Sequence, residues 1–269
     1  MTPGTTDRPR RRPLRPSESG HLVANPLQAT VDRADAATLD GSDGVVICGT
    51  TVPLRWRRSP RARRIALRID PLDGDIVITL PARASRRDGL TFLRSHEAWL
   101  ADRLASLPSR QEFAAGMSVP VDAIPRLVVH VPEARGGVRI RDHEILVSGD
   151  AMFIRRRVRD ALCFRARETF TRLAFEKAQT VGVRPSRIRI RDTISRWGSC
   201  APDRTLMFCW RLIMAPPFVQ DYVVAHEVAH LRHMDHGPAF WLLTEQLTEH
   251  RASASLWLTR NGPALLRIG

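Results

Sequence analysis

At 269 residues the chain is long enough for one large domain or two small ones, and its 43% hydrophobic and 26% charged residues are the balance of a globular protein. No apolar run approaches the roughly 20 residues that a membrane-spanning helix needs. The basic N-terminal residues also lack the apolar stretch of a secretory signal peptide. We therefore expect a cytoplasmic protein that makes no membrane contact.

The net charge of +14 comes almost entirely from arginine, because Lys177 is the only lysine. An arginine excess suits phosphate binding, so nucleic acid contact through an arginine-rich surface is one expectation. A GC-rich genome would produce the same bias, and the arginines are spread along the chain. The four cysteines form no C-x-x-C pair, which favours free thiols in a reducing compartment over a zinc ribbon.

Residues 1–43 combine Pro, Arg, Asp, Thr and Ser with little apolar periodicity, which predicts a flexible, basic, disordered tail. Residues 44–150 predict a β-rich region with one helix. Strand-like segments flank a turn signal at Gly49-Thr50, and the segments RRIALRID and DIVITLP alternate polar and apolar residues. The helix is predicted to begin at a capping box formed by Ser85 and Asp88. Further strands follow in LVVHV and in VRIRDHEILV.

Residues 151–269 predict a helix-dominated region. A long helix is expected from about 151 to 180, ending at Gly182, and strands in RIRIRD and TLMFCWRL bracket the loop SRWGSCAPDR. A β-rich first half followed by a helical second half indicates the α+β class. The apolar stripe of the long helix is expected to contain Phe153, Ile154, Val158, Leu162, Phe170, Leu173 and Phe175.

The segment DYVVAHEVAHLRHMDHGPAFW carries the chemistry. His226 and His230 are four residues apart, so a helix places both imidazoles on one face, where they can bind a single ion. Glu227 would project beside that face, within reach of a water on the metal. This is the H-E-x-x-H pattern of zinc-dependent hydrolases, and the surrounding apolar residues indicate a buried helix. A chance match of the pattern is the alternative.

A catalytic zinc ion takes three protein ligands and keeps one position open. His236 is the expected third ligand, because it lies just before Gly237-Pro238, where the chain can turn back over the metal. His233 is a rival, since it is seven residues from His226 and also near the same face. Some zincins use a carboxylate instead, so Glu245 and Glu249 also remain candidates.

The stretches RWGSC, WRLIMAPP, DYVVAHEVAHL and HGPAFW resemble the YgjP-like metallopeptidases, which are related to the SprT-like and Wss-like zincins. The resemblance is strongest over residues 187–260. It implies a zincin-like catalytic half built around the H-E-x-x-H helix, with a β-rich N-terminal half. It also implies that Zn²⁺ binds to His226, His230 and His236, with Glu227 as the catalytic residue.

Two residues differ from the usual pattern of this family. Cys209 stands where an asparagine is usual, and Gly237 stands where a serine is usual, which affects expected substrate contacts more than the metal. The loop RWGSC, with Arg196, Trp197 and Ser199, is expected to pack against the active-site helix through Trp197. The alternative is that Arg196 or Ser199 donates to the oxygen of the scissile carbonyl. Cys200 has no evident base that would make it a nucleophile.

The implied activity is hydrolysis of a protein or peptide substrate by a metal-activated water, with Glu227 as general base. Two alternatives stay open. One is a metal-dependent endoribonuclease, whose H-G-x-x-H-L-x-x-x-D-H pattern differs here by having Glu227 in place of glycine. The other is a DNA-associated protein with a structural metal, for which Cys200 or Cys209 would have to supply a fourth ligand. A peptidase acting on DNA-bound proteins would combine the implied peptidase activity with the second alternative.

Overall fold

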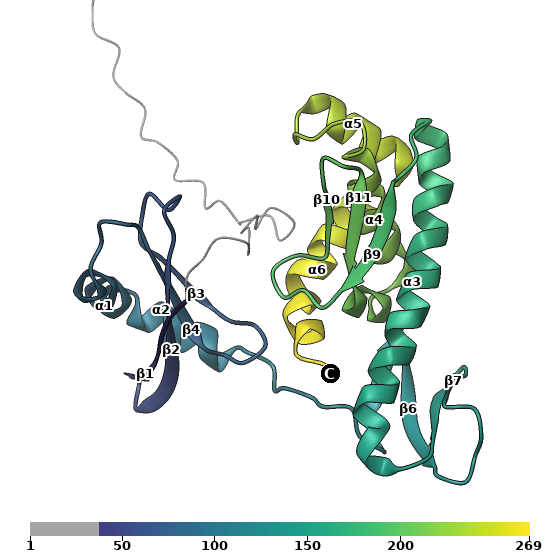
Figure 1. Ribbon diagram of the computed structural model, residues 1–269, viewed down its shortest axis with the longest axis horizontal. Coiled ribbons are helices and arrows are strands. Elements are labelled where there is room, and N and C mark those ends of the chain that lie inside the picture. The colour runs from purple at the N-terminus through teal and green to yellow at the C-terminus, as the bar shows by residue number, and fades with distance from the viewer. Residues whose placement is uncertain (1–37) are drawn as a thin grey trace, which may run out of the picture.

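The structure is a computed structural model that describes residues 38–269. Most of the predicted tail therefore lies outside the described residues, and strand β1 already begins at Thr38. Two separate hydrophobic cores divide the described chain, one drawing on residues between 45 and 104 and the other on residues between 113 and 268. We call the two parts the N-terminal lobe and the C-terminal lobe; Figure 1 shows them joined by an extended segment.

The N-terminal lobe is a four-stranded sheet in the order β1-β2-β4-β3, with two helices against it. β1 and β2 form the predicted hairpin, in which Gly49 adopts φ +82° at the turn. The predicted capping box is confirmed, since Ser85 and Asp88 exchange hydrogen bonds at the start of the first helix. The elements are β1 (Thr38–Ile47), β2 (Thr50–Arg58), β3 (Ala66–Ile69), β4 (Ile76–Leu80), α1 (Arg86–Ser95) and α2 (Glu97–Ala105).

The single helix expected in this region is two helices that meet at His96. The His96 ring packs on Phe92, and its Nδ1 lies 2.9 Å from the Phe92 carbonyl oxygen. The Ser95 hydroxyl donates to the same oxygen. These side chains take the acceptor that the His96 N–H would use in a continuous helix, so the backbone turns there instead. The apolar stripe alone did not reveal this competition.

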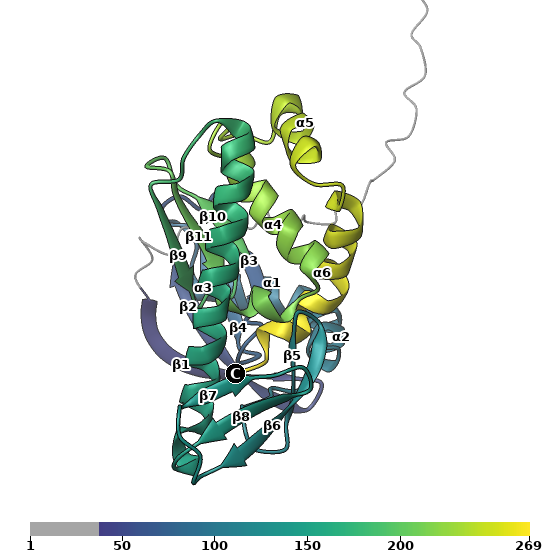
Figure 2. The same cartoon turned by 90° about the vertical axis from the view of Figure 1, so that its right-hand side faces the viewer.

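The C-terminal lobe begins with a second four-stranded sheet, in the order β5-β6-β8-β7. The strands expected in VRIRDHEILV are present as two short strands, which pair antiparallel. This sheet lies beside the first turns of a long helix, as Figure 2 shows. Buried residues of the sheet and of the helix belong to one core. The cores therefore divide the described chain near residue 110, whereas the sequence suggested a boundary between residues 150 and 151. The strands are β5 (Ser118–Val121), β6 (Ile124–Val131), β7 (Val138–Ile140) and β8 (Glu144–Ser148).

The long helix α3 (Ile154–Val181) runs along the C-terminal lobe and ends at Gly182, which adopts φ +65° as expected of a helix-terminating glycine. Its buried stripe differs in part from the prediction. Phe175 is exposed, and alanines occupy much of the buried face, which lets neighbouring backbones approach closely. The buried residues recur every four positions: Ile154, Val158, Leu162, Ala166, Phe170, Ala174 and Ala178.

The remaining elements of the C-terminal lobe are a small sheet, in the order β10-β11-β9, and three helices. The strand expected in TLMFCWRL stops at Cys209, because the buried residues that follow form a 3₁₀ turn whose carbonyls accept from the β5–β6 turn. No helix within residues 38–269 is long and apolar enough to cross a membrane. The elements are β9 (Arg187–Arg191), β10 (Gly198–Cys200), β11 (Thr205–Cys209), α4 (Pro217–Ala229), α5 (Pro238–Leu247) and α6 (Arg251–Leu266).

Two phenylalanines on α3 test this packing. Phe170 is fully buried against Phe208, so Phe170→Ala should lower the free energy of unfolding of the C-terminal lobe by about 3–5 kcal/mol. Phe164 is 62% exposed, so Phe164→Ala on the same helix should change it by less than about 1 kcal/mol. Urea unfolding of the two variants measures the difference, and equal losses would contradict the assigned core face.

Candidate metal centre

Helix α4 is buried on nearly all sides. Pro217 stands at its first turn, where a missing N–H costs nothing, and valines and alanines fill most of the positions that follow. The helix packs against α3, α5, α6 and β10. Tyr222, one turn before His226, is buried in this core. Any polar side chain that α4 carries is therefore removed from water.

His226 and His230 share one face of α4. His230 is the C-cap residue, but its φ of −64° and ψ of −18° keep it in helical conformation, so the four-residue spacing holds. The two ring centroids are 5.0 Å apart. His236, from the segment between α4 and α5, brings its Nε2 to 3.2 Å from the Nε2 of His226. One nitrogen from each of the three rings lies within 4.8 Å of the others.

The rival ligands do not join this group. His233 contributes its backbone carbonyl, which accepts from the Nδ1 of His230 at 2.9 Å. Glu245 pairs with Arg251, and the side chain of Glu249 is exposed. Among the residues from 38 to 269, the only group of three or more potential metal-binding side chains consists of His226, His230 and His236.

The donors fit a divalent metal ion. Because a carbonyl oxygen can only accept, the bond to His233 places the proton of His230 on Nδ1 and leaves the Nε2 lone pair available. Two nitrogens that bind one tetrahedral ion at about 2.0–2.1 Å lie about 3.3 Å apart. The Nε2 atoms of His226 and His236 have this spacing. Nδ1 of His226 is buried without a hydrogen-bond partner in the described chain.

Aromatic side chains hold the three imidazoles in place. Phe240, which is fully buried on α5, stacks on His230 with ring centroids 4.4 Å apart and contacts the other two rings edge-on. Burial lowers the pKa of all three histidines, that of His226 to about 3. The rings are therefore neutral at neutral pH, which is the form that binds a cation.

Glu227 follows His226 on α4 and is also buried, with 3% of its surface exposed. Burial raises the pKa of its carboxyl to about 8, and the nearby Arg196 opposes that rise. Its side chain rests against Gly198 on β10. A Cβ atom built on Gly198 would lie 2.6 Å from both Cγ and Oε1 of Glu227. The absence of a side chain at position 198 therefore makes the room that the carboxylate occupies.

The RWGSC loop thus lies directly against the carboxylate. Trp197 is buried next to Gly262 of α6, whose missing side chain leaves room for the indole. Burial, together with the nearby Glu227, raises the pKa of the Cys200 thiol to about 12, so this thiol stays protonated at neutral pH. Sequence reasoning did not identify the role of Gly198. The available signal was a glycine inside a predicted packing loop, which often marks a close approach.

Residues 63–261 match a protein family described as YgjP-like, metallopeptidase domain. No curated protein and no solved structure gives a significant match. The matched segment spans about three quarters of the chain and includes the three histidines, Glu227 and the RWGSC loop. The family resemblance expected from the sequence is confirmed: the chain belongs to the YgjP-like metallopeptidase family.

Proposed function

We propose that this metallopeptidase is zinc-dependent, that His226, His230 and His236 hold the ion, and that Glu227 is the general base. The observation that carries the proposal is the convergence of three neutral imidazoles next to one buried carboxylate. The family match supports a metallopeptidase in general. The zincin-like arrangement of the C-terminal lobe belongs to the same proposal.

Zinc fits this donor set. Imidazole nitrogen is a preferred zinc ligand, and three protein ligands leave one position for a water or a substrate, as in catalytic zinc sites. A structural zinc site would use a fourth protein ligand. In the described part of the chain, neither Cys200 nor Cys209 belongs to the group. The three-ligand set therefore favours a catalytic ion.

Zinc, when bound at such a site, lowers the pKa of a water and polarises a substrate carbonyl. Glu227 would accept the proton of the attacking water and deliver it to the leaving amine. Burial favours the protonated form of this carboxyl, whereas a bound cation would favour the deprotonated form, so the group could accept a proton and return it. Arg196 and Ser199 stay candidates for donors to the scissile carbonyl oxygen, beside the packing role of Trp197.

The peptidase reading is favoured over the two alternatives. The endoribonuclease pattern has glycine at the position of Glu227, and the family match is to a metallopeptidase domain. Nucleic acid contact stays a prediction. Part of the arginine excess serves the fold, since Arg55 pairs with Asp73 and Asp75 and other arginines make similar pairs. The cytoplasmic location also stays a prediction.

Removing the base and removing a ligand should have different effects. Glu227→Gln should keep the bound zinc but lose peptidase activity by about 10²–10⁴-fold, because the amide cannot accept the proton. His230→Ala should lose both zinc and activity. Zinc content after dialysis and cleavage of casein measure the two quantities. Glu249→Gln is the matched control: this exposed carboxylate lies outside the group, so both quantities should stay unchanged. Turnover by the Glu227→Gln variant would refute the assigned base.

The glycine beside the carboxylate provides a second test. Gly198→Ala places a methyl group where Glu227 lies, and a displacement of about 1 Å can cost about 100-fold in rate. We expect kcat to fall by about that factor while the zinc content is unchanged, because no ligand is touched. Equal rates for the Gly198→Ala variant and the unaltered protein would contradict this packing.

A further inference from the structure

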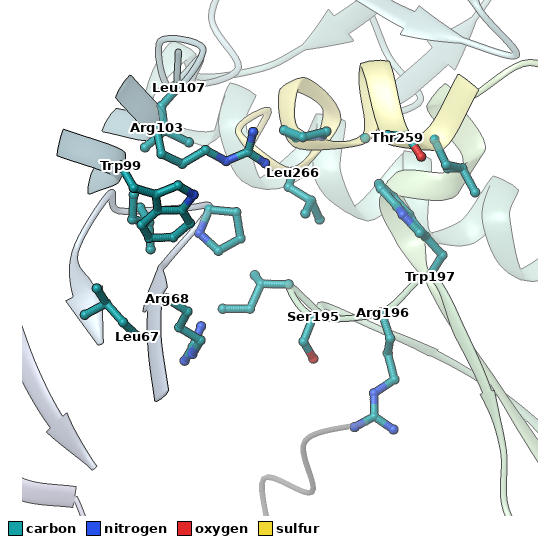
Figure 3. Close-up of a pocket in the computed structure, with 16 residues that line it drawn as sticks. Leu67, Arg68, Trp99, Arg103, Leu107, Ser195, Arg196, Trp197, Thr259 and Leu266 are labelled. Atoms are coloured by element: carbon teal, nitrogen blue, oxygen red, sulfur yellow. The ribbon is translucent and has the colours of Figure 1, made fainter. Parts of the chain in front are cut away.

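A cleft of about 630 Å³ lies between the two lobes. The N-terminal lobe contributes β3, with Trp99 and Arg103 of α2 above it, and the C-terminal lobe contributes the loop over residues 194–197 and one side of α6. Figure 3 shows Arg68 on β3 across the cleft from Ser195 and Arg196. Neither lobe could form this cleft alone.

The cleft meets β3 along its edge. Leu67, Arg68 and Ile69 all line it, although successive side chains of a strand point to opposite faces of the sheet. A cavity that contacts three consecutive residues must therefore border the strand from the side. β3 is the last strand in the order β1-β2-β4-β3, so within the described residues its outer edge has no pairing strand. Such an edge presents backbone N–H and C=O groups to an added strand.

The side chains around this edge define what an added strand would contain. Leu67 and Ile69 are half-buried against the lobe core, whereas Arg68 points to the opposite, exposed face. Arg103 and Arg196 also line the cleft, and none of its described lining residues is acidic. The carboxylate of Asp70 lies 3.9 Å from Arg68, at the end of the strand. A segment that alternates apolar and acidic residues would match both faces.

One short segment borders both the cleft and the proposed base of the candidate metal centre. Arg196 and Trp197 line the cleft, and the next residue, Gly198, lies against the Glu227 carboxylate. A segment lying in the cleft would therefore touch the same loop that borders the proposed base. This continuity makes the cleft suited to a part of the substrate that lies away from the bond to be cleaved.

We propose that the inter-lobe cleft binds an extended acidic peptide segment, which adds to β3 as a fifth strand of the N-terminal sheet. The inference rests on the proposed function in one respect, namely that the substrate is a protein or peptide. A nucleic acid could satisfy the arginines and stack on Trp99, which is 48% exposed, but it could not form the backbone hydrogen bonds of a strand. The edge of β3 therefore favours a peptide.

The binding test uses the full-length Glu227→Gln variant, so that no probe is hydrolysed. The probe is a fluorescein-labelled octapeptide alternating valine and glutamate, and fluorescence anisotropy measures its dissociation constant. A valine–lysine octapeptide should bind at least about tenfold more weakly, because lysine would face the arginines. Two further probes carry backbone N-methyl groups, one at every valine and the other at every glutamate. In an extended peptide the valine N–H groups point to one edge and the glutamate N–H groups to the other. At least one of the two probes should lose binding, because one edge of the peptide faces β3.

The matched protein variants are Arg103→Glu in the cleft and Arg87→Glu on α1. Both reverse one exposed arginine of the same lobe, but Arg87 does not line the cleft. We expect weaker binding of the valine–glutamate probe only for Arg103→Glu. Equal loss in both variants, undiminished binding of both N-methylated probes, or displacement of the peptide by an eight-nucleotide oligothymidylate would overturn the proposal. The N-methylated probes are tested with protein whose cleft residues are unchanged. Their result therefore does not depend on whether a charge-reversed variant folds.

Failure of this inference can be told apart from failure of the proposed function. Binding is measured without turnover, while casein cleavage by the unaltered enzyme is measured separately. Cleavage of casein without binding of the valine–glutamate probe would remove the cleft proposal alone. Probe binding with the expected edge dependence, in a protein that cleaves no peptide, would support the cleft and remove only the peptidase assignment.

Discussion

The burial of α4 is the constraint on which the rest of the structure depends. A helix removed from water on nearly every side carries two imidazoles and a carboxylate, groups whose burial is unfavourable without compensation. Residues packed around α4 supply part of that compensation. The His233 carbonyl orients one ring, Phe240 packs on all three, and Arg196 acts on the Glu227 carboxylate. A cation shared by the three rings would complete the set.

The architecture around α4 follows from this requirement. The alanine-rich face of α3 allows close packing on one side, and the glycine of β10 makes room for the carboxylate on another. The segment after α4 must turn at once to bring His236 back, which it does before α5 begins at Pro238. Residues 196–198, at the start of β10, border both the proposed base and the inter-lobe cleft. The proposed chemistry and the proposed substrate binding would thus share one short segment.

Local signals in the sequence predicted local structure well. The strand expected in DIVITLP is β4, although Ile76, Val77 and Ile78 are all buried and the expected alternation of burial is not seen. The Ser85–Asp88 capping box starts α1, and Gly182 ends α3. These signals depend on interactions between residues a few positions apart in the chain. The local structure that they favour therefore does not depend on tertiary contacts. The single helix expected after Ser85 was wrong, because the His96 and Ser95 side chains compete for one carbonyl and periodicity does not report such a competition.

The sequence by itself determined that two histidines and one carboxylate of the candidate site share a buried helix. The four-residue spacing puts His226 and His230 on one helical face, since a helix has a fixed pitch, and the apolar neighbours bury that helix. Only the tertiary structure decided that His236 and not His233 approaches the pair, that Gly198 lies against Glu227, and that β5–β8 join the C-terminal core. These outcomes depend on contacts between residues far apart in the chain, for which spacing along the sequence carries no information.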